Sequence, residues 1–395
     1  MAERPLVYLV AGEPSGDQLG ARLVAALRAA AGDRIAFAGV GGPRLAEQGV
    51  QSLFPIDDLS VMGLLEVLPH LPRLLRRMRE TEADIVARRP DLVVTIDSPG
   101  FTFRLASRLR RRLGRSLTMV HYVAPSVWAW KPKRAAATAR LFDHLLTLLP
   151  FEPPYFEREG LATTFVGHAA IEQAPSRADG LAFRRRHGIP DDALVLALLP
   201  GSRRGELQRH WDVFAAAAGL LAARHPRLRL VVPTVEALER EVRARAGSLA
   251  IPAEVGTFAG EKGAALAACD VALAASGTVA VELAAAGVPC VVAYRIHPIT
   301  YRIVKRMIRV RFASVINLLL DRPAVPELLQ EACRPDSLDA ALEALVGDPG
   351  TRAAQIAQTE AALTLLGKAG PPPSVRAAEA LLRLPALAKG LETAQ

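Results

Sequence analysis

The sequence predicts an α/β protein made of two successive doubly wound domains, each built on a parallel sheet. Short apolar runs of strand length alternate with helical patterns along most of the chain. Several of these runs end in glycine-containing loops that open a helix. A polar, proline-containing segment at residues 169–180 separates two stretches in which this pattern starts afresh. We therefore place the linker between two domains there.

Length and composition fit this fold class. The chain has 395 residues, of which 51% are hydrophobic, which is enough for two cores. Its net charge of +9 predicts an anionic partner, which is a nucleic acid, an anionic membrane surface or a phosphorylated substrate. Three widely spaced cysteines argue against a disulfide framework or a C-x-x-C metal clip and favour a reducing cytosol. We see no signal-peptide pattern and no apolar stretch of about 20 residues that would span a bilayer.

The first domain opens with a strand at residues 6–10, a loop at residues 12–17 and a helix. Ligands of doubly wound sheets bind at the carboxyl ends of the strands, so Glu13 and Asp17 are candidate site residues. Asp17 fits equally well as a charge that complements the dipole of the helix. The loop lacks G-x-G-x-x-G, so we do not predict a dinucleotide fold.

A second carboxylate follows the strand predicted at residues 91–96. Asp97 stands at its carboxyl end and would serve as a general base if burial or neighbours tune its pKa. The alternative is a turn-forming aspartate before Ser98-Pro99-Gly100. Further strands are expected at residues 35–40, 117–120, 145–149 and 163–166. The loop at residues 121–131, rich in aromatic and polar groups, has the composition of a functional loop.

The second domain repeats the pattern. A strand at residues 194–199 leads into a loop with Gly201, Ser202 and Arg203, and the arginine is placed to pair with phosphate oxygens. Strands are expected at residues 228–232, 253–258, 271–275 and 290–294.

The turn Ser276-Gly277-Thr278 follows the strand at 271–275 and opens an alanine-rich helix. Free N–H groups and the helix dipole make this start an anion site that suits a diphosphate. Glu282, four residues after Thr278, is placed to accept hydrogen bonds from ribose hydroxyls. The alternative is an ordinary capped helix start with a solvated glutamate.

Two stretches combine apolar and basic residues. In the first, one helical face carries an apolar stripe while arginines lie off it, with the stripe formed by Leu64, Val67, Leu68, Leu71, Leu74, Leu75 and Met78. Such a stripe lies either in a membrane interface or against a core. Pro69 and Pro72 predict a break, or a short helix that restarts after Pro72. The second stretch, residues 295–317, fits either an anion-holding helix or a surface helix.

Together these features predict transfer of a sugar from a nucleotide, with the substrate held in a cleft between the domains. The diphosphate would leave, stabilised by the helix start and Arg203, while Asp97 would take the proton of the attacking hydroxyl. There is no H-E-x-x-H and no D-x-D cluster, so we expect no metal cofactor.

The chain resembles the lipid-A-disaccharide synthase family of inverting glycosyltransferases, which have the two-domain GT-B fold. The matching motifs in the first half are A-G-E-P-S-G-D at 11–17, G-V-G-G-P-R at 39–44, M-G-L-L-E-V-L at 62–68, I-D-S-P-G-F at 96–101, H-Y-V-A-P-S-V-W-A-W at 121–130, L-P-F-E at 149–152 and G-H at 167–168. Those in the second half are L-P-G-S-R at 199–203, A-S-G-T-x-x-x-E at 275–282 and N-L-L at 317–319. They follow the family's order over nearly the whole chain.

The resemblance implies a reaction. UDP-2,3-diacylglucosamine and 2,3-diacylglucosamine 1-phosphate would give the β-1,6-linked lipid A disaccharide 1-phosphate and UDP. It also implies a cytoplasmic enzyme, peripheral on the inner membrane of a Gram-negative bacterium, with an anionic membrane surface rather than nucleic acid as partner. The oligomeric state stays open, with a homodimer as one alternative.

The resemblance also assigns site residues. Asp97 matches the family's essential acidic residue, and Glu13, Arg203, Glu282 and Asn317 match further positions that matter for activity. Ser276, Gly277 and Thr278 match the UDP loop, and the membrane-facing element falls on residues 64–75. Pro69 and Pro72 depart from a smooth helix there, and Pro14 and Ser98 stand where alanine is more usual. The implied domains are residues 1–170 and 171–350, with residues 351–395 crossing back to the first.

Two alternatives remain. Another GT-B enzyme acting on a UDP-amino sugar, an undecaprenyl-linked N-acetylglucosaminyl transferase or a UDP-N-acetylglucosamine 2-epimerase, would share the fold. A nucleic-acid-binding protein would share the charge, but it predicts aromatic residues among the basic ones, and the basic runs here carry leucines instead.

Overall fold

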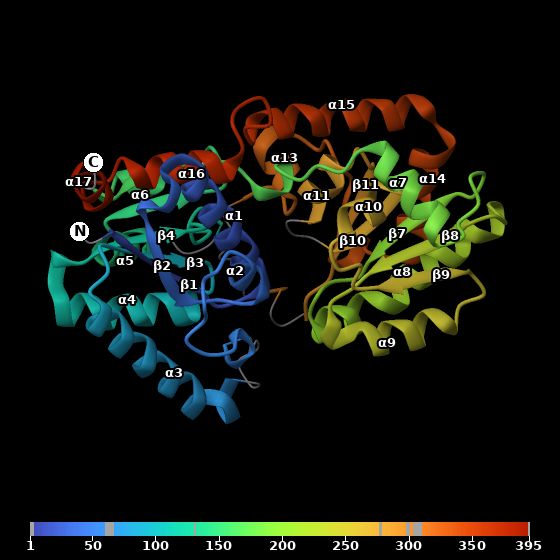
Figure 1. Cartoon of the computed structure of the whole chain (residues 1–395). Coiled ribbons are helices and arrows are strands. Elements are labelled where there is room, and N and C mark those ends of the chain that lie inside the picture. Colours follow the sequence, from blue (N-terminus) through green and yellow to red (C-terminus); the bar gives the residue numbers. More distant parts are fainter. Residues whose placement is uncertain are drawn as a thin grey trace. The chain divides into compact units, whose positions relative to one another are not determined.

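A computed structural model describes residues 4–59, 67–129, 132–275, 279–297, 301–302 and 310–393, without the side chains of 67–70 and 392–393. The chain forms two compact units (Figure 1). The first unit contains Met1–Ala169 and Ala369–Gln395, and the second contains Ala170–Lys368. The segment 351–395 therefore divides. Helix α15 (Pro349–Leu365) packs within the second unit, whereas α16 (Pro373–Leu382) and α17 (Pro385–Thr393) belong to the first.

Within its described residues, the first unit has a parallel sheet of six strands in the order β2-β1-β3-β4-β5-β6. The strands are β1 (Leu6–Ala11), β2 (Ala36–Val40), β3 (Leu92–Ile96), β4 (Thr118–Tyr122), β5 (His144–Thr147) and β6 (Ala162–Phe165). The strand order reverses between β1 and β3, which pair with Ala11 opposite Ile96. Such a reversal opens a crevice at the carboxyl ends of the two strands.

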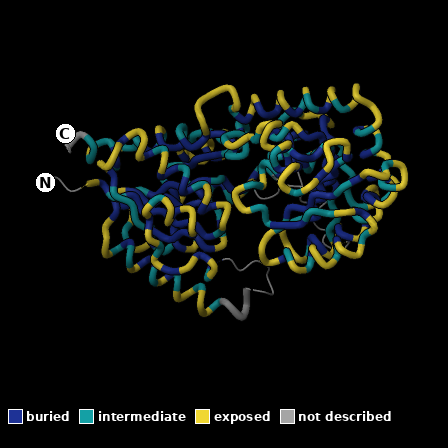
Figure 2. Tube along the Cα trace, turned by 45° about the vertical axis from the view of Figure 1, so that its right-hand side comes forward, coloured by how far each residue is buried: buried dark blue, intermediate teal, exposed yellow. Residues whose placement is uncertain are grey.

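Helices cover both faces of this sheet. Alternate residues of β1 face opposite layers, as the pleat requires. Val7 and Leu9 join the core beneath α1 (Pro14–Ala31), α16 and α17. Tyr8 and Val10 join the core beneath α3 (Val67–Arg88) and α4 (Pro99–Leu113). The central strands β1 and β3 are buried, and the outer helix faces are exposed (Figure 2). The remaining helices of this unit are α2 (Pro43–Glu47), α5 (Arg134–Leu141) and α6 (Pro153–Glu157).

Helix α3 corrects one expectation. It runs from Val67 to Arg88 with Pro72 inside it, so the predicted break is wrong. Pro69 falls in the first turn, where the missing N–H would have no helical partner anyway. Beyond Pro72 the helix is anchored by Met78 and Ile85, which are buried in the core. That packing offsets the hydrogen bond lost at Pro72.

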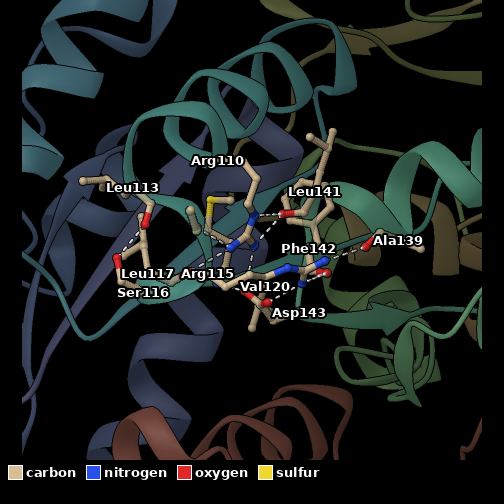
Figure 3. A network of polar contacts seen from close by, with 12 residues as sticks. Arg110, Leu113, Arg115, Ser116, Leu117, Val120, Ala139, Leu141, Phe142 and Asp143 are labelled. Carbon is tan, nitrogen blue, oxygen red and sulfur yellow. Dashed lines mark hydrogen bonds and ion pairs between the residues drawn. The ribbon is translucent and has the colours of Figure 1, made fainter.

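A cluster of two arginines and an aspartate ties together the end of the sheet opposite the crevice (Figure 3). Arg110 of α4 donates from Nε and Nη2 to the Leu141 carbonyl, at 3.0 and 2.7 Å, and from Nη1 to the carbonyls of Gly114 and Leu117. Its Nη2 also contacts Asp143 at 2.8 Å. Asp143 accepts further bonds from Arg115 and from the Met119 N–H. We call Arg110, Arg115 and Asp143 the closed arginine cluster.

The second unit repeats the architecture. Within its described residues a parallel sheet of six strands has the order β12-β11-β10-β7-β8-β9. The strands are β7 (Val195–Leu199), β8 (Arg229–Pro233), β9 (Ala253–Gly256), β10 (Val271–Ala275), β11 (Cys290–Tyr294) and β12 (Glu327–Leu329). The order reverses between β10 and β7, so a second crevice opens at their carboxyl ends.

The helices of the second unit cover its sheet in the same way. They include α7 (Arg177–Arg186), α8 (Arg204–Arg224), α9 (Glu236–Gly247), α10 (Lys262–Ala267), α11 (Val279–Ala285), α13 (Val315–Leu320), α14 (Pro335–Gly347) and α15. Trp211 and Phe214 of α8 and Leu342 of α14 are central to the core. No helix in the described ranges is both long and apolar enough to pass through a membrane.

Candidate active site

The crevice of the first unit brings the two predicted carboxylates to neighbouring strand ends. Glu13 follows β1 and Asp97 follows β3, and both are half-buried. The two loops approach each other closely, since a Cβ atom on Gly12 would lie 2.7 Å from Ser98 Oγ. Any other residue at position 12 would push the loops apart. The geometry therefore places Glu13 and Asp97 on one edge of the sheet.

Asp97 sits on strained backbone. Asp97 and Ser98 both have positive φ, 50° and 46°, which is uncommon for residues other than glycine. The Asp97 N–H donates to the Tyr122 carbonyl at 2.9 Å, and Thr102 Oγ1 donates to the Asp97 carbonyl at 2.8 Å. These bonds hold the residue in a conformation that is favoured by neither aspartate nor serine. Strain of this kind clusters at functional sites.

Asp17 has a structural task. It is buried, and its carboxylate accepts from the N–H groups of Gly42, Arg44 and Leu45 at 2.7, 2.9 and 3.1 Å. These are the free donors at the start of α2. Asp17 thus caps a neighbouring helix, a role that the sequence did not suggest, and it also lies in the first turn of α1, as the helix-dipole alternative expected.

The aromatic loop after β4 is anchored by a buried glutamate. Glu152 accepts from Trp128 Nε1 at 3.1 Å and from the N–H groups of Leu148 and Leu149. Burial raises the pKa of Glu152 to about 7, against the opposing effect of these three donors. The loops after β4 and β5 are therefore joined through one carboxylate. Glu152 belongs to one of the sequence motifs, but the sequence alone could not predict this contact. Trp130 and Lys131 of the same loop lie outside the described residues.

In the second unit, the loop after β7 folds around a glutamate of α8. Oε2 of Glu206 accepts from the N–H groups of Ser202 and Arg203, at 3.1 and 3.4 Å. Its Oε1 accepts from Arg203 Nη1 at 3.3 Å. The Arg203 side chain is 62% exposed, whereas that of Glu206 is 11% exposed. The guanidinium that we expected at a phosphate is thus held at one nitrogen and open to solvent.

The same face of α8 also fixes the segment after β11. Tyr294 donates its hydroxyl to Glu206 Oε1 at 3.2 Å. His210, one turn along α8, accepts from the Arg295 N–H at Nε2, so its Nδ1 carries the proton donated to the Pro200 carbonyl. Burial lowers the pKa of His210, which favours this neutral form. Sequence reasoning missed Glu206 and His210, although their i, i+4 spacing places them on one helix face.

The predicted UDP loop, Ser276, Gly277 and Thr278, lies outside the described residues. Helix α11 begins directly after it and carries Glu282, which is partly buried. Oε2 of Glu282 lies 2.5 Å from Nζ of Lys262, at the start of α10. A lysine therefore neutralises the carboxylate that was expected to contact a ribose.

Asn317 is fully buried on α13 and its amide is engaged within its own segment. Nδ2 donates to the Val325 carbonyl and to Glu327 Oε1, at 2.8 and 2.7 Å, while Oδ1 accepts from the Val325 N–H. These hydrogen bonds shape the segment before β12, and the role in activity that the resemblance implies for Asn317 stays a prediction.

The predicted membrane side is only partly described. Leu64 lies outside the described residues, and so do the side chains of Val67 and Leu68 on α3. Leu71 is half-buried and Leu75 is 38% exposed. Arg77, also on α3, pairs with Asp58 and Glu80.

Comparison with known proteins identifies the family. Residues 7–369 match the family described as lipid-A-disaccharide synthetase. This chain belongs to the lipid-A-disaccharide synthetase family. It is 52% identical to a lipid-A-disaccharide synthase of Rhodospirillum centenum, over 96% of this chain and 94% of that protein. It is 50% identical to one of Paramagnetospirillum magneticum, over 95% of this chain and 97% of that protein. The resemblance seen in the motifs is confirmed, and the enzyme class is glycosyltransferase.

Solved structures confirm the GT-B fold. A UDP-GlcNAc 2-epimerase from Neisseria meningitidis aligns with a TM-score of 0.66 at 13% identity, covering 96% of this chain and 99% of that one. The glycotransferase of kitacinnamycin aligns with a TM-score of 0.60 at 18% identity, covering 96% and 99%. At such low identity these likenesses define the fold alone. Among the described residues, no group of three or more His, Cys, Asp or Glu is placed to hold a metal ion.

Proposed function

We propose that this protein joins UDP-2,3-diacylglucosamine to 2,3-diacylglucosamine 1-phosphate and releases UDP, in the biosynthesis of lipid A. The observation that carries the proposal is the family match over residues 7–369, together with relatives at about half identity over almost the whole chain. The fold also suits an epimerase, but the family match favours the transferase.

The second unit would bind the UDP-sugar. Arg203 offers an exposed guanidinium at the crevice, and phosphate oxygens are its natural partners. Glu282 would accept hydrogen bonds from the ribose, with Lys262 compensating its charge beside the diphosphate. As the bond from the anomeric carbon to the diphosphate breaks, its electron pair passes to UDP. Arg203 would stabilise that charge.

The first unit would bind the acceptor. The 6-hydroxyl of the acceptor sugar attacks the anomeric carbon from the face opposite the diphosphate, which gives the β-linkage by inversion. Asp97 would take the proton of that hydroxyl. Glu13, at the neighbouring strand end, would help to position the sugar.

Both substrates carry acyl chains, so the protein would work at a membrane. A net charge of +9 and the exposed Leu75 beside the arginines of α3 support peripheral binding to the anionic cytoplasmic face of an inner membrane. We further propose that the reaction needs no added metal, since Arg203 supplies positive charge at the diphosphate. A homodimer is compatible with this proposal but no part of it.

Replacing Asp97 with Asn tests the base. The carboxylate loses its basicity while its shape is kept, so turnover with both acylated substrates should fall at least about 100-fold. UDP affinity, measured by calorimetry, should stay near that of the wild type. The exposed Asp57 offers a control, because Asp57→Asn should leave both quantities unchanged.

Wild-type turnover in Asp97→Asn would refute the base assignment. The same assay with a chelator tests metal independence, which a loss of UDP release would contradict. Incubation with UDP-N-acetylglucosamine alone, followed by NMR of the sugar C2, distinguishes an epimerase from the transferase.

A further inference from the structure

Glu206 of α8 holds together the described residues at the edge of the second crevice. Among the described residues it receives hydrogen bonds from the N–H groups of Ser202 and Arg203, from the Arg203 guanidinium and from the Tyr294 hydroxyl. These donors come from the loop after β7 and from the last residue of strand β11. One side chain therefore connects the arginine loop to β11, which is separated from β7 by β10 in the sheet.

The loop after β7 is shaped to admit this carboxylate. Gly201 has φ 119°, a conformation that other residues rarely adopt. A Cβ atom on Gly201 would also lie 2.5 Å from Glu206 Cβ and 2.6 Å from its Oε2. Both the backbone conformation and the lack of a side chain are thus needed for Glu206 to fit. The carboxylate is an integral part of the loop.

A buried carboxylate beside a diphosphate site carries a cost, because the two anions repel each other. A carboxylate at this position is favourable only if it performs a function on which ligand binding depends. Glu206 holds Arg203 through Nη1, and the guanidinium has five N–H donors in a rigid plane. Because Glu206 holds Nη1 and the side chain is 62% exposed, the other guanidinium donors stay accessible to a ligand.

We propose that Glu206 is a positioning residue of the donor site, which orients Arg203 toward the diphosphate of the UDP-sugar. The inference rests on the proposed function and deepens it. It also changes which groups of the loop after β7 are expected to contact the diphosphate. The N–H groups of Ser202 and Arg203 are taken up by Glu206. Within this loop, contact with the diphosphate therefore falls to the Arg203 side chain, while Gly201 and Ser202 shape the loop.

Glu206→Gln tests the proposal by calorimetry with UDP. The amide keeps the volume but loses the charge, and its NH₂ group opposes the donors that face it. A lost charge-assisted hydrogen bond should weaken UDP binding about tenfold. The KM for the donor should rise by a similar factor, while the KM for the acceptor should not change. In an Arg203→Gln background, Glu206→Gln should cause no further loss of UDP affinity.

Glu343→Gln is the matched control. Glu343 accepts from Arg224 and His225 at the far end of α8, so its loss perturbs the same helix away from the crevice. UDP affinity should be unchanged in that variant. Tyr294→Phe is a milder test that leaves the carboxylate in place and removes one donor to it. We expect UDP binding to weaken about threefold, a fraction of one hydrogen bond.

Three results would overturn the inference. If UDP affinity is unchanged while the melting temperature falls, Glu206 serves only to cap α8. If UDP binds more tightly, Glu206 occupies the anion site and is displaced by phosphate. If the losses in Glu206→Gln and Arg203→Gln add, the two residues act independently. Failure of the wild-type protein to bind UDP would instead refute the proposed function, and this inference with it.

Discussion

Two sites in this protein contain the same contact between an arginine and a carboxylate, but they differ in how many of the arginine's donors are already engaged. In the closed arginine cluster, Arg110 donates from all three of its nitrogens to carbonyls or to Asp143, and its side chain is 12% exposed. At the loop after β7, Arg203 donates from Nη1 to Glu206, and its side chain is 62% exposed. The first arginine is saturated with partners, whereas the second has donors left for a ligand.

The two sites differ in what their arginines can still do: Arg110 is structural, whereas Arg203 keeps donors for the ligand proposed above. Both guanidiniums are oriented by a carboxylate, Arg110 from the last turn of α4 and Arg203 from the residue before α8. What differs is the number of donors that the fold has already used. A saturated guanidinium can contribute only to stability, while a partly engaged one is oriented and still able to bind an anion.

The largest expected effect is on stability in the closed cluster. Arg110→Gln removes one partner of Asp143 and the donor to the carbonyls of Leu141, Gly114 and Leu117, which should cost about 3 kcal/mol of unfolding free energy. Hydrogen exchange of the β4 and β5 amides measures this locally. The exposed Arg111 next to it is the control, since Arg111→Gln should change stability by less than about 0.5 kcal/mol. If hydrogen exchange of the β4 and β5 amides were unchanged in Arg110→Gln, the closed arginine cluster would not differ from the Arg203 site in its contribution to stability.

The second effect is on ligand binding at the open site. Arg203→Gln should weaken UDP binding about 30-fold, the loss expected for a strong charge-assisted contact of about 2 kcal/mol. Stability should change by less than about 0.5 kcal/mol, because the side chain is exposed. Arg204→Gln, whose arginine is 65% exposed and pairs with Glu241 at 3.6 Å, should leave UDP binding intact. Equal losses in both variants would mean that only net charge matters.

The smallest effect depends on pH. Burial alone would raise the pKa of Asp143, but the Met119 N–H, Arg110 and Arg115 outweigh it and hold the pKa below its usual value. A depressed pKa means that Asp143 stabilises the fold above about pH 4 and loses this contribution as the pH falls through the lower folded value. The stability gap between the wild type and Asp143→Asn should therefore shrink by about 1 kcal/mol per pH unit below pH 4. Urea unfolding at pH 7, 4 and 3 measures it, and a constant gap would contradict the assignment.

Local patterns in the sequence predicted the strands well because buried parallel strands are continuous apolar runs. The segments 271–275 and 290–294 coincide with β10 and β11. The strand expected at 253–258 ends at Gly256, since the chain turns at Phe258, which has positive φ. Strand β12 was missed, because three half-buried residues at the sheet edge carry no periodic signal.

The same patterns placed Asp97 and Arg203 at strand ends, since an apolar run followed by a loop marks the edge where parallel sheets bind ligands. They could not reveal partners that are distant in sequence. Asp17 accepts hydrogen bonds from N–H groups 25 to 28 residues away. The Asn317 amide forms hydrogen bonds with Val325 and Glu327. Glu206 was not singled out from the sequence, because a glutamate near the start of a helix is usually a solvent-exposed charge that complements the helix dipole.

The first unit is built from both ends of the chain, and this has a consequence for synthesis. Ala377, Leu381 and Leu387 complete the core that begins with Val7 and Leu9 on β1. That core stays open on the ribosome until residues 369–393 emerge, although its six strands are made first. The second unit, which is continuous in sequence, has no such delay. The first unit, most of which is translated first, should therefore be the last to finish folding. Its incomplete core should make it the unit that depends more on chaperones during synthesis.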